Sequence, residues 1–521
     1  MPDLQNKNCL SSGDALFLYF EREGQPVNVA SVSVFEGTIP LELCTEYIES
    51  KLPLIPRYRQ RVVFPPFNLD LPGWEYDPKF DIRNHVREIT LKRGTESEFK
   101  AVAAQILSSA LNRERPLWEL TLIRGLKGNR TGAILRMHHC LADGISGVGV
   151  LNVLMDTSPF FPPLPKDKPP CPPPPAGSGV SSRDGLILSS LSAIQRILSA
   201  SAEVLDVAKH VVAAVENPSP ASQAPDESGE QKEARTRVLE EVKRLLPEAI
   251  TLADRLPFNV VCRGPQKFGW AEIPLAEIKA VKQACGVTVN DVVLAAVTGA
   301  IRRYAELHRV RLKGRQLRIV VPVNVRGEES ASDLGNRITF LPISIPLDIA
   351  DPRELIEAAH EAVEYGRKAR LGEMVGLFGT LLGTIPPALQ AVLGPLVSQL
   401  PINLCNLICT NVPGPKVPLY LCGHKLLSFY PYVPIGGEMG MNCAILTYNG
   451  TAYFGFTGDA HAIPDLAQLE KLLRLSFASL RKAAGVRSPR AKVAPPKAQA
   501  ISSPTAAVPR ETVADLKAMG A

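Results

Sequence analysis

The segment that decides the fold is TGAILRMHHCLADGISGVGVLNVLM, residues 131–155. Its first part is an apolar run that favours a β-strand and ends at two adjacent histidines, His138 and His139. After Asp143 and Gly144 the apolar residues recur with helical spacing. The segment therefore predicts a strand, a turn and a helix, with ionisable side chains where the strand ends.

An imidazole at this turn can act as a general base, because the unperturbed pKa of histidine, about 6.5, lies near neutral pH. Neighbouring side chains on an extended strand point to opposite faces, so His138 and His139 cannot both face one cavity. We predict that His139 is the base and that His138 supports it. Asp143 is expected to organise the loop by pairing with a cation.

Two other interpretations of the histidines are open. A histidine pair can be purely structural, and a histidine near an aspartate can form the corner of a metal site. No third ligand stands at the spacing of the usual ligand sets, so no metal site is predicted. The sequence has no GxSxG motif and no other nucleophile with a base partner, which argues against an acyl-enzyme. Cys140 is expected to be buried and unreactive.

The pattern HHxxxDG, formed by His138, His139, Asp143 and Gly144, resembles the signature of an acyltransferase superfamily. That superfamily includes chloramphenicol acetyltransferase, the condensation domains of peptide synthetases and the bacterial wax ester synthase/diacylglycerol acyltransferases. Further motifs resemble the last branch. They are, in chain order, the WxxDxxFDxxxHV that begins at Trp74, the PLW of Pro116, Leu117 and Trp118, the ND of Asn290 and Asp291, and the NVPGP that begins at Asn411.

The resemblance implies an α/β fold, an α+β sandwich of two chloramphenicol-acetyltransferase-like lobes with a substrate channel at their interface. With 521 residues, 45% hydrophobic and 21% charged, the chain is long enough for this arrangement. The expected parts are an N-terminal lobe carrying HHxxxDG over 1–158, a proline-rich linker with connecting helices over 159–250, a C-terminal lobe over 251–484 and a basic tail without ordered structure over 485–521.

The sequence TVNDVVLA in the second lobe predicts the start of a helix, with Thr288 or Asn290 as its N-cap. A helix N-terminus also offers donors and a positive field to a developing oxyanion. The resemblance implies that Asn290 belongs to the active site, with Asp291 in support. Asn290 is therefore either a transition-state donor or a plain cap, and both interpretations stay open.

Residues 318–326, RIVVPVNVR, predict a strand that ends in an arginine. In the superfamily the aspartate of HHxxxDG pairs with an arginine from the other lobe. The resemblance therefore implies that Arg326 pairs with Asp143, which suits the bidentate geometry of a guanidinium. A surface charge at a strand end is the alternative.

Pro116, Leu117 and Trp118 are assigned to the substrate channel, with an architectural role. The proline stops the preceding helix, and Trp118 begins a strand beside the histidine strand. Residues 10–20, LSSGDALFLYF, predict a short capped apolar helix. We interpret the aromatic residues of that helix as core packing.

The resemblance implies an O-acyltransferase that moves a fatty acyl group from acyl-CoA to diacylglycerol, giving triacylglycerol, or to a long-chain alcohol, giving a wax ester. His139 would abstract the hydroxyl proton, and His139, Asp143 and Asn290 would form the catalytic group. No cofactor is implied, because acyl-CoA is a co-substrate. A condensation-type enzyme that uses carrier-bound acyl groups and a catalytically degenerate lipid-binding protein are the rival hypotheses.

No charged residue lies between Glu373 and Lys416, so we expect residues 374–400 to line an apolar channel or to lie on a membrane. Prolines and glycines interrupt that stretch and argue against a true span. The net charge of +6 suits anionic ligands or membrane surfaces, and no nucleic-acid motif is present. Ten cysteines without CxxC pairs and a start without secretory features predict a cytoplasmic protein, peripherally associated with membrane or lipid inclusions.

Overall fold

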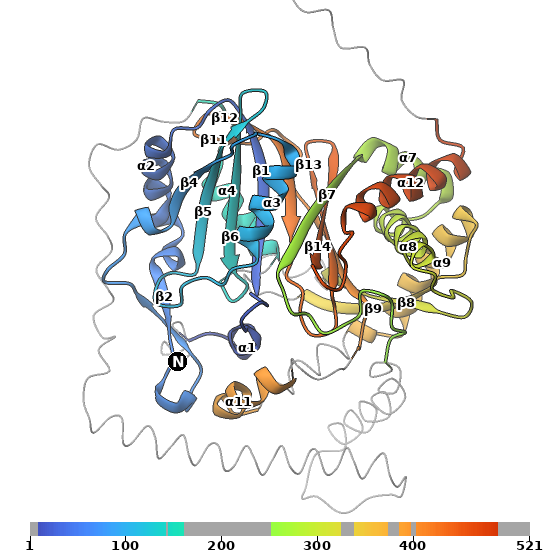
Figure 1. Ribbon diagram of the computed structural model, residues 1–521, viewed down its shortest axis with the longest axis horizontal. Coiled ribbons are helices and arrows are strands. Elements are labelled where there is room, and N and C mark those ends of the chain that lie inside the picture. The colour runs from blue at the N-terminus through green and yellow to red at the C-terminus, as the bar shows by residue number, and fades with distance from the viewer. Residues whose placement is uncertain are drawn as a thin grey trace, which may run out of the picture. The chain divides into compact units, whose positions relative to one another are not determined.

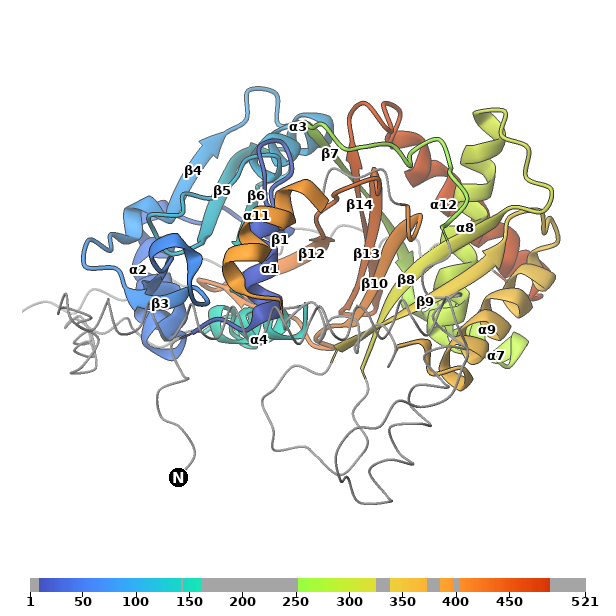
Figure 2. The same ribbon diagram turned by 90° about the horizontal axis from the view of Figure 1, so that it is seen from below.

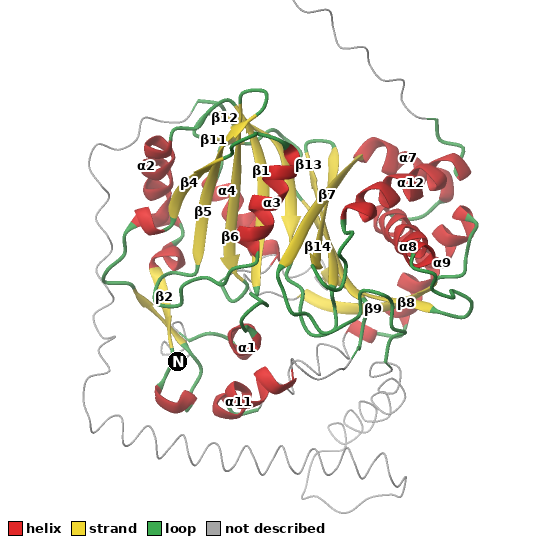
Figure 3. Ribbon diagram, viewed as in Figure 1, coloured by secondary structure: helices red, strands yellow, loops and turns green. Residues whose placement is uncertain are grey.

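Two six-stranded sheets form the framework of the computed structural model, which describes residues 9–141, 144–160, 252–324, 338–372, 385–397 and 403–487 (Figure 1). Helices lie beside both sheets, so the molecule has the alternating layers of an α/β protein (Figure 3). The predicted linker over 159–250 lies outside the described residues except for its first two. The predicted tail over 485–521 does so except for its first three.

The first sheet contains the histidine strand. Its strands are β1 (Asn28–Glu36), β4 (Val86–Thr90), β5 (Trp118–Leu126), β6 (Arg130–His138), β11 (Tyr420–Leu421) and β12 (His424–Tyr432). Their order is β11-β12-β1-β6-β5-β4, with β6 antiparallel to both of its neighbours. A separate two-stranded sheet pairs β2 (Gln60–Val63) with β3 (Gly73–Tyr76).

Helices cover both faces of the first sheet. They are α2 (Leu41–Lys51), α3 (Glu96–Leu107) and α4 (Gly144–Leu154). Alternate residues of β6 face the two layers: Ala133 and Leu135 face α4, whereas Gly132 lies against Phe99 of α3. The order of β6, turn and α4 confirms the strand, turn and helix predicted from the sequence.

The second sheet has the order β7-β14-β13-β10-β8-β9. Its strands are β7 (Gln266–Pro274), β8 (Gln316–Asn324), β9 (Ile338–Pro346), β10 (Leu407–Pro413), β13 (Met441–Tyr448) and β14 (Thr451–Asp459). The helices gathered at this sheet are α7 (Leu275–Cys285), α8 (Val289–Leu307), α9 (Pro352–Lys368) and α12 (Ala467–Ala483) (Figure 1). Helix α8 is apolar nearly all round, as expected of a helix enclosed between other helices and a sheet.

The two lobes are not separated cleanly in sequence. Strands β11 and β12 come from the C-terminal part of the chain, yet β12 pairs with β1 and completes the first sheet. The division of the chain at residue 251 therefore describes the order of segments but not the membership of the sheets. Strands β11 and β12 therefore connect the C-terminal part of the chain to the sheet that carries the histidines.

Aromatic side chains fill the junction between the lobes. Trp270 of β7 stacks on Tyr430 of β12, with ring centroids 4.6 Å apart, and meets Phe99 of α3 edge to face. Lys100 lies over the Trp270 ring and pairs with Glu470 of α12 at 2.7 Å. Because these contacts are buried and apolar at their centre, we expect them to hold the lobes in one arrangement.

Two further helices, α1 (Ser12–Phe20) and α11 (Pro387–Val397), lie near the histidine end of the first sheet and pack on each other (Figure 2). Within the described residues, no single helix is long and apolar enough to cross a membrane. Helices α7 and α8, which are bent by 102° relative to each other, would together be long and apolar enough, by length and composition only.

Candidate active site

Backbone hydrogen bonds fix the turn that follows β6. His139 N–H donates to the carbonyl of Val27 at 2.9 Å, and His138 N–H donates to that of Leu117 at 2.9 Å. Leu141 N–H returns to the carbonyl of His138 at 2.9 Å and closes the turn. The two histidines are therefore held by the strands on both sides of β6.

His138 is fully buried and serves the turn itself. Its Nδ1 accepts the N–H of Cys140 at 3.1 Å, and its Nε2 lies 3.6 Å from Glu21 Oε1. Burial, and then the charges of Arg113 and His139, lower the pKa of His138 to about 3. His138 is consequently neutral at physiological pH and is shielded from solvent, and its supporting role stays a prediction.

A partly buried ion pair between Glu21 and Arg113 lies beside this turn and involves the end of α1. Glu21, at the C-terminal end of α1, accepts a hydrogen bond from Arg113 Nη2 at 2.9 Å and another from Val27 N–H at 3.1 Å. Arg113 also donates to the carbonyl of Leu18 at 2.8 Å. The carboxylate thus has hydrogen-bond partners on two other segments, as a buried charge requires.

His139 is only partly buried, and an aromatic ring covers its face. The rings of His139 and Phe17 stack with centroids 4.0 Å apart and an interplanar angle of 27°. Leu18 of the same helix lies in the core, whereas Phe17 does not belong to any of the three apolar core clusters of the described residues. The interpretation of the aromatic residues of α1 as core packing is therefore wrong for Phe17.

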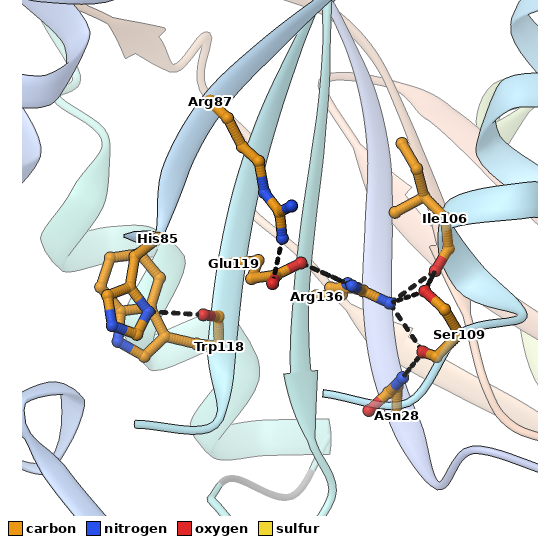
Figure 4. Close-up of polar contacts among 8 residues, drawn as sticks. All are labelled: Asn28, His85, Arg87, Ile106, Ser109, Trp118, Glu119 and Arg136. Carbon is orange, nitrogen blue, oxygen red and sulfur yellow. Dashed lines mark hydrogen bonds and ion pairs between the residues drawn. The ribbon is translucent and has the colours of Figure 1, made fainter. Parts of the chain in front are cut away.

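A second ion pair supports β6 just before the histidines (Figure 4). Arg136 is buried, pairs with Glu119 through Nε at 3.0 Å, and donates from Nη1 to the carbonyl of Ser109 at 2.7 Å. Asn28, which lies opposite His138 in the sheet, donates to the same carbonyl at 3.1 Å. Figure 4 shows these groups as a continuous chain from Arg87 to Asn28. They lock the strand end to the end of α3.

Cys140 is buried beside Leu18 and Leu117, as expected. Burial raises the pKa of its thiol, so the thiol stays protonated at neutral pH. This environment agrees with the prediction that Cys140 takes no part in catalysis.

Thr288 caps α8 in the second lobe. Its hydroxyl accepts Asp291 N–H at 3.2 Å, and the Asp291 carboxylate accepts Thr288 N–H at 2.8 Å, which is a capping box. Asp291 is fully buried and also meets Nδ1 of His360 at 2.8 Å. The alternative that Asn290 is a plain cap is therefore wrong, because Thr288 is the N-cap, and Asp291 fixes the start of the helix. Its predicted support of an active site stays a prediction.

Asn290 lies in the first turn of α8 and is partly exposed. Its Oδ1 accepts a long hydrogen bond, 3.4 Å, from Nδ2 of Asn411 on β10. This orientation leaves the amide hydrogens of Asn290 as the donors that it can offer to a bound group. The NVPGP motif marks Asn411 in the sequence, but the motif alone does not reveal that Asn411 lies beside Asn290.

The remaining predicted residues fall in different places. Asp143 and Arg326 lie outside the described residues, and Gly144 is the first residue of α4. Leu117 and Trp118 are buried, and the indole of Trp118 donates to the carbonyl of Tyr58 at 2.7 Å. These positions favour the architectural role of the PLW motif over a place in the channel wall.

Trp118 also stacks on His85, whose ring is enclosed between Trp118 and Phe80. Burial lowers the pKa of His85, and its Nδ1 lies 2.8 Å from the Trp118 carbonyl. His85 is therefore a structural residue.

An apolar cavity of about 20 Å³ lies under α4. It is lined by side chains of β1, β5, β6, α2 and α4, including Phe35, Ile48, Leu120, Leu135, Leu151 and Leu154. The substrate channel between the lobes stays a prediction. No group of three or more His, Cys, Asp or Glu side chains in the described part of the chain could hold a metal ion.

The chain is similar to named acyltransferases along nearly its whole length. A probable diacylglycerol O-acyltransferase of Mycobacterium tuberculosis is 28% identical over 483 residues, 91% of this chain and 96% of that protein. A second probable diacylglycerol O-acyltransferase of the same organism is 28% identical over 496 residues, 92% of this chain and 100% of that protein.

Two solved structures share the fold. The wax ester synthase/diacylglycerol acyltransferase from Marinobacter aquaeolei VT8 has a TM-score of 0.62 at 22% identity, over 92% of this chain and 100% of that chain. The first condensation domain of the calcium-dependent antibiotic synthetase has a TM-score of 0.53 at 14% identity, over 92% and 96%. At these identities the likeness concerns the fold alone, and it confirms the predicted two-lobed architecture.

Family models cover most of the chain. The wax ester synthase/diacylglycerol acyltransferase catalytic domain matches residues 10–293, and the C-terminal domain of the same family matches residues 334–481. The chain therefore belongs to the wax ester synthase/diacylglycerol acyltransferase family and is an acyltransferase.

Proposed function

We propose that this acyltransferase moves a fatty acyl group from acyl-CoA to the free hydroxyl of diacylglycerol and so forms triacylglycerol. A long-chain alcohol, which would give a wax ester, is the second candidate acceptor. The observation that carries the proposal is His139, a partly exposed imidazole on a fixed turn in a chain of this family. The names of the Mycobacterium tuberculosis relatives favour diacylglycerol.

In the proposed reaction, His139 takes the hydroxyl proton while the acceptor oxygen attacks the thioester carbon. The C–S bond then breaks, the new ester leaves, and the CoA thiolate receives the proton from His139. His138 cannot replace His139 as the base, because it is buried and its lowered pKa makes it a weak base. No covalent intermediate on the protein is needed.

The developing negative charge on the thioester oxygen needs a donor. Asn290 is the proposed donor, since its Oδ1 already faces Asn411 and its amide hydrogens point away from that contact. The positive field at the start of α8 would act in the same direction. We also propose that Asp143 and Arg326 pair across the lobes, as the family resemblance implies.

We further propose a cytoplasmic enzyme that works at the surface of a membrane or lipid inclusion, because its products are water-insoluble. Helix α11 supports this proposal. It has no charged residue and exposes Leu389 by 44%, Val392 by 63% and Leu393 by 37%. Burying such side chains in lipid is favourable.

The test is an assay of purified protein with palmitoyl-CoA and either dioleoylglycerol or hexadecanol, with thiol release and ester formation followed together. We expect ester and CoA in equal amounts with at least one acceptor, and loss of both in His139→Ala. Ester formation only from carrier-bound acyl groups would instead support the condensation-type hypothesis. Unchanged lipid yield in His139→Ala would support a lipid-binding protein.

A further inference from the structure

We propose that Phe17 is a specificity-determining residue, which keeps water away from His139 so that the acyl group passes to the lipid hydroxyl. This inference rests on the proposed acyl transfer. It concerns a choice that the transfer itself leaves open, namely which hydroxyl group His139 deprotonates. Its consequence is that removing the Phe17 ring should turn the enzyme towards hydrolysis of acyl-CoA.

Water is the competing acceptor at any such site. If His139 took a proton from water, the water oxygen would attack the thioester carbon, the C–S bond would break, and the CoA thiolate would receive the proton. The products would be a free fatty acid and CoA, with no other reagent consumed. An acyltransferase must therefore exclude water from its base until the lipid acceptor is bound.

The geometry at His139 restricts the directions from which water can approach the imidazole. With ring centroids 4.0 Å apart and an angle of 27° between the rings, Phe17 and His139 are in van der Waals contact. No water molecule fits between them. One face of the imidazole is thus closed, and an acceptor must approach the ring nitrogens along the edge.

Core packing does not account for this placement. Leu18 belongs to the apolar cluster beneath the turn, together with Cys140, and Tyr19 is also buried. Phe17 belongs to no core cluster of the described residues and is partly exposed. Its aromatic contact is with the ring of His139.

The helix that carries Phe17 is held at both ends. At its start, Ser11 Oγ accepts the N–H of Asp14 at 3.1 Å, and at its end Glu21 is tied to Arg113. Helix α11 packs on α1 so closely that a Cβ on Gly394 would lie 3.2 Å from Tyr19 (Figure 2). The Phe17 ring is therefore a fixed wall of the site.

The experiment compares Phe17→Ala with wild type in the assay of palmitoyl-CoA and dioleoylglycerol. Thiol release gives total turnover, and the ratio of palmitic acid to triacylglycerol gives the choice of acceptor. We expect that ratio to rise about tenfold or more in Phe17→Ala, with total thiol release largely retained. In H2¹⁸O the label should enter the palmitic acid.

Two further variants serve as controls, and a third tests whether the effect is graded. Phe17→Tyr keeps a ring over the imidazole and should keep the wild-type ratio. Phe20→Ala removes an equal ring from the same helix, on the side that meets Gly394, and should also leave the ratio unchanged. Phe17→Leu, which disturbs packing less than alanine, should give an intermediate ratio.

Each outcome has a distinct meaning. An unchanged ratio in both Phe17→Ala and Phe17→Leu, or an equal rise in Phe20→Ala, overturns the inference while ester synthesis by wild type upholds the proposed function. Wild-type protein that forms no ester overturns the proposed function itself. A ratio that rises in Phe17→Ala and returns in Phe17→Tyr supports both.

Discussion

The histidine turn of the first lobe and the start of α8 in the second lobe have a similar local arrangement of polar residues. Each presents a pair of adjacent polar residues, His138 with His139 and Asn290 with Asp291. In each pair one member is fully buried, and its neighbour is partly exposed. The buried member, His138 or Asp291, accepts backbone N–H groups and fixes the local turn.

The difference between the two sites is equally instructive. The histidine turn is held by side chains of other segments, notably the carboxylate of Glu21, which lies beside His138 and is paired with Arg113. The start of α8 is held mainly by its own capping box, with His360 as the added partner. The first site therefore depends on tertiary packing, whereas the second follows largely from local sequence.

The largest expected effect is a difference in activity between variants of the two histidines. We expect His139→Ala to lower kcat/KM about a thousandfold with little change in the free energy of unfolding, because it removes the proposed base from a partly exposed position. His138→Asn keeps an acceptor for Cys140 N–H and should lose much less activity. Kinetics and urea unfolding of both variants test this. Equal losses of activity would contradict the division of roles.

Substitutions of Asn290 and Asp291 should likewise affect activity and stability separately. Asn290→Ala is expected to lower kcat about a hundredfold with a small change in stability, since it removes a transition-state donor. Asp291→Ala should lower the unfolding free energy by about 2 kcal/mol, because it breaks the capping box and leaves buried donors without an acceptor. An Asn290→Ala variant with wild-type kcat would show that only the backbone of this helix start contributes.

The lowered pKa of His138 predicts a dependence of stability on pH. The folded protein keeps His138 neutral down to about pH 3, whereas the unfolded chain binds a proton near pH 6.5, about the ordinary pKa of histidine. Because the unfolded state binds more protons in this window, the unfolding free energy should fall with falling pH, by up to about 1.4 kcal/mol per unit.

The matched variant isolates that contribution. His138→Asn cannot titrate, so its unfolding free energy should fall less steeply than that of wild type between about pH 6 and pH 4. Urea unfolding at a series of pH values measures both slopes. Parallel profiles for the two proteins would mean that His138 is protonated in the folded state.

The smallest expected effect concerns the cap itself. Thr288→Ala should cost about 1 kcal/mol of stability, and Thr288→Ser should restore most of it, because serine supplies the same hydroxyl acceptor. Activity should change less than twofold in both variants. A large loss of activity in Thr288→Ala at preserved stability would show that the cap also contacts the reacting groups.

Short sequence patterns were sufficient to predict several local elements of the fold. The apolar run before His138 and the helical spacing after Gly144 were enough to place β6, the turn and α4. The alternation of side chains on a strand was enough to predict that the two histidines have different surroundings. The TVND sequence marked a helix start, but it could not decide between Thr288 and Asn290 as the cap, since both residue types suit that position.

Contacts between distant segments could not be read from such patterns. The place of Phe17 over His139, of Asn411 beside Asn290 and of β12 beside β1 each joins residues more than a hundred positions apart. A hydrophobic period states which face of an element is buried, but not which element buries it.

By itself, the sequence determined the family, the two lobes and the chemistry-bearing side chains, because each depends on residue types at short and fixed spacing. The tertiary structure alone decided the surroundings of those side chains. It buried His138 and Asp291 and left their neighbours partly exposed, and it set an aromatic ring against His139. The physical reason is that burial and contact arise from packing whole elements together, and packing depends on the entire chain.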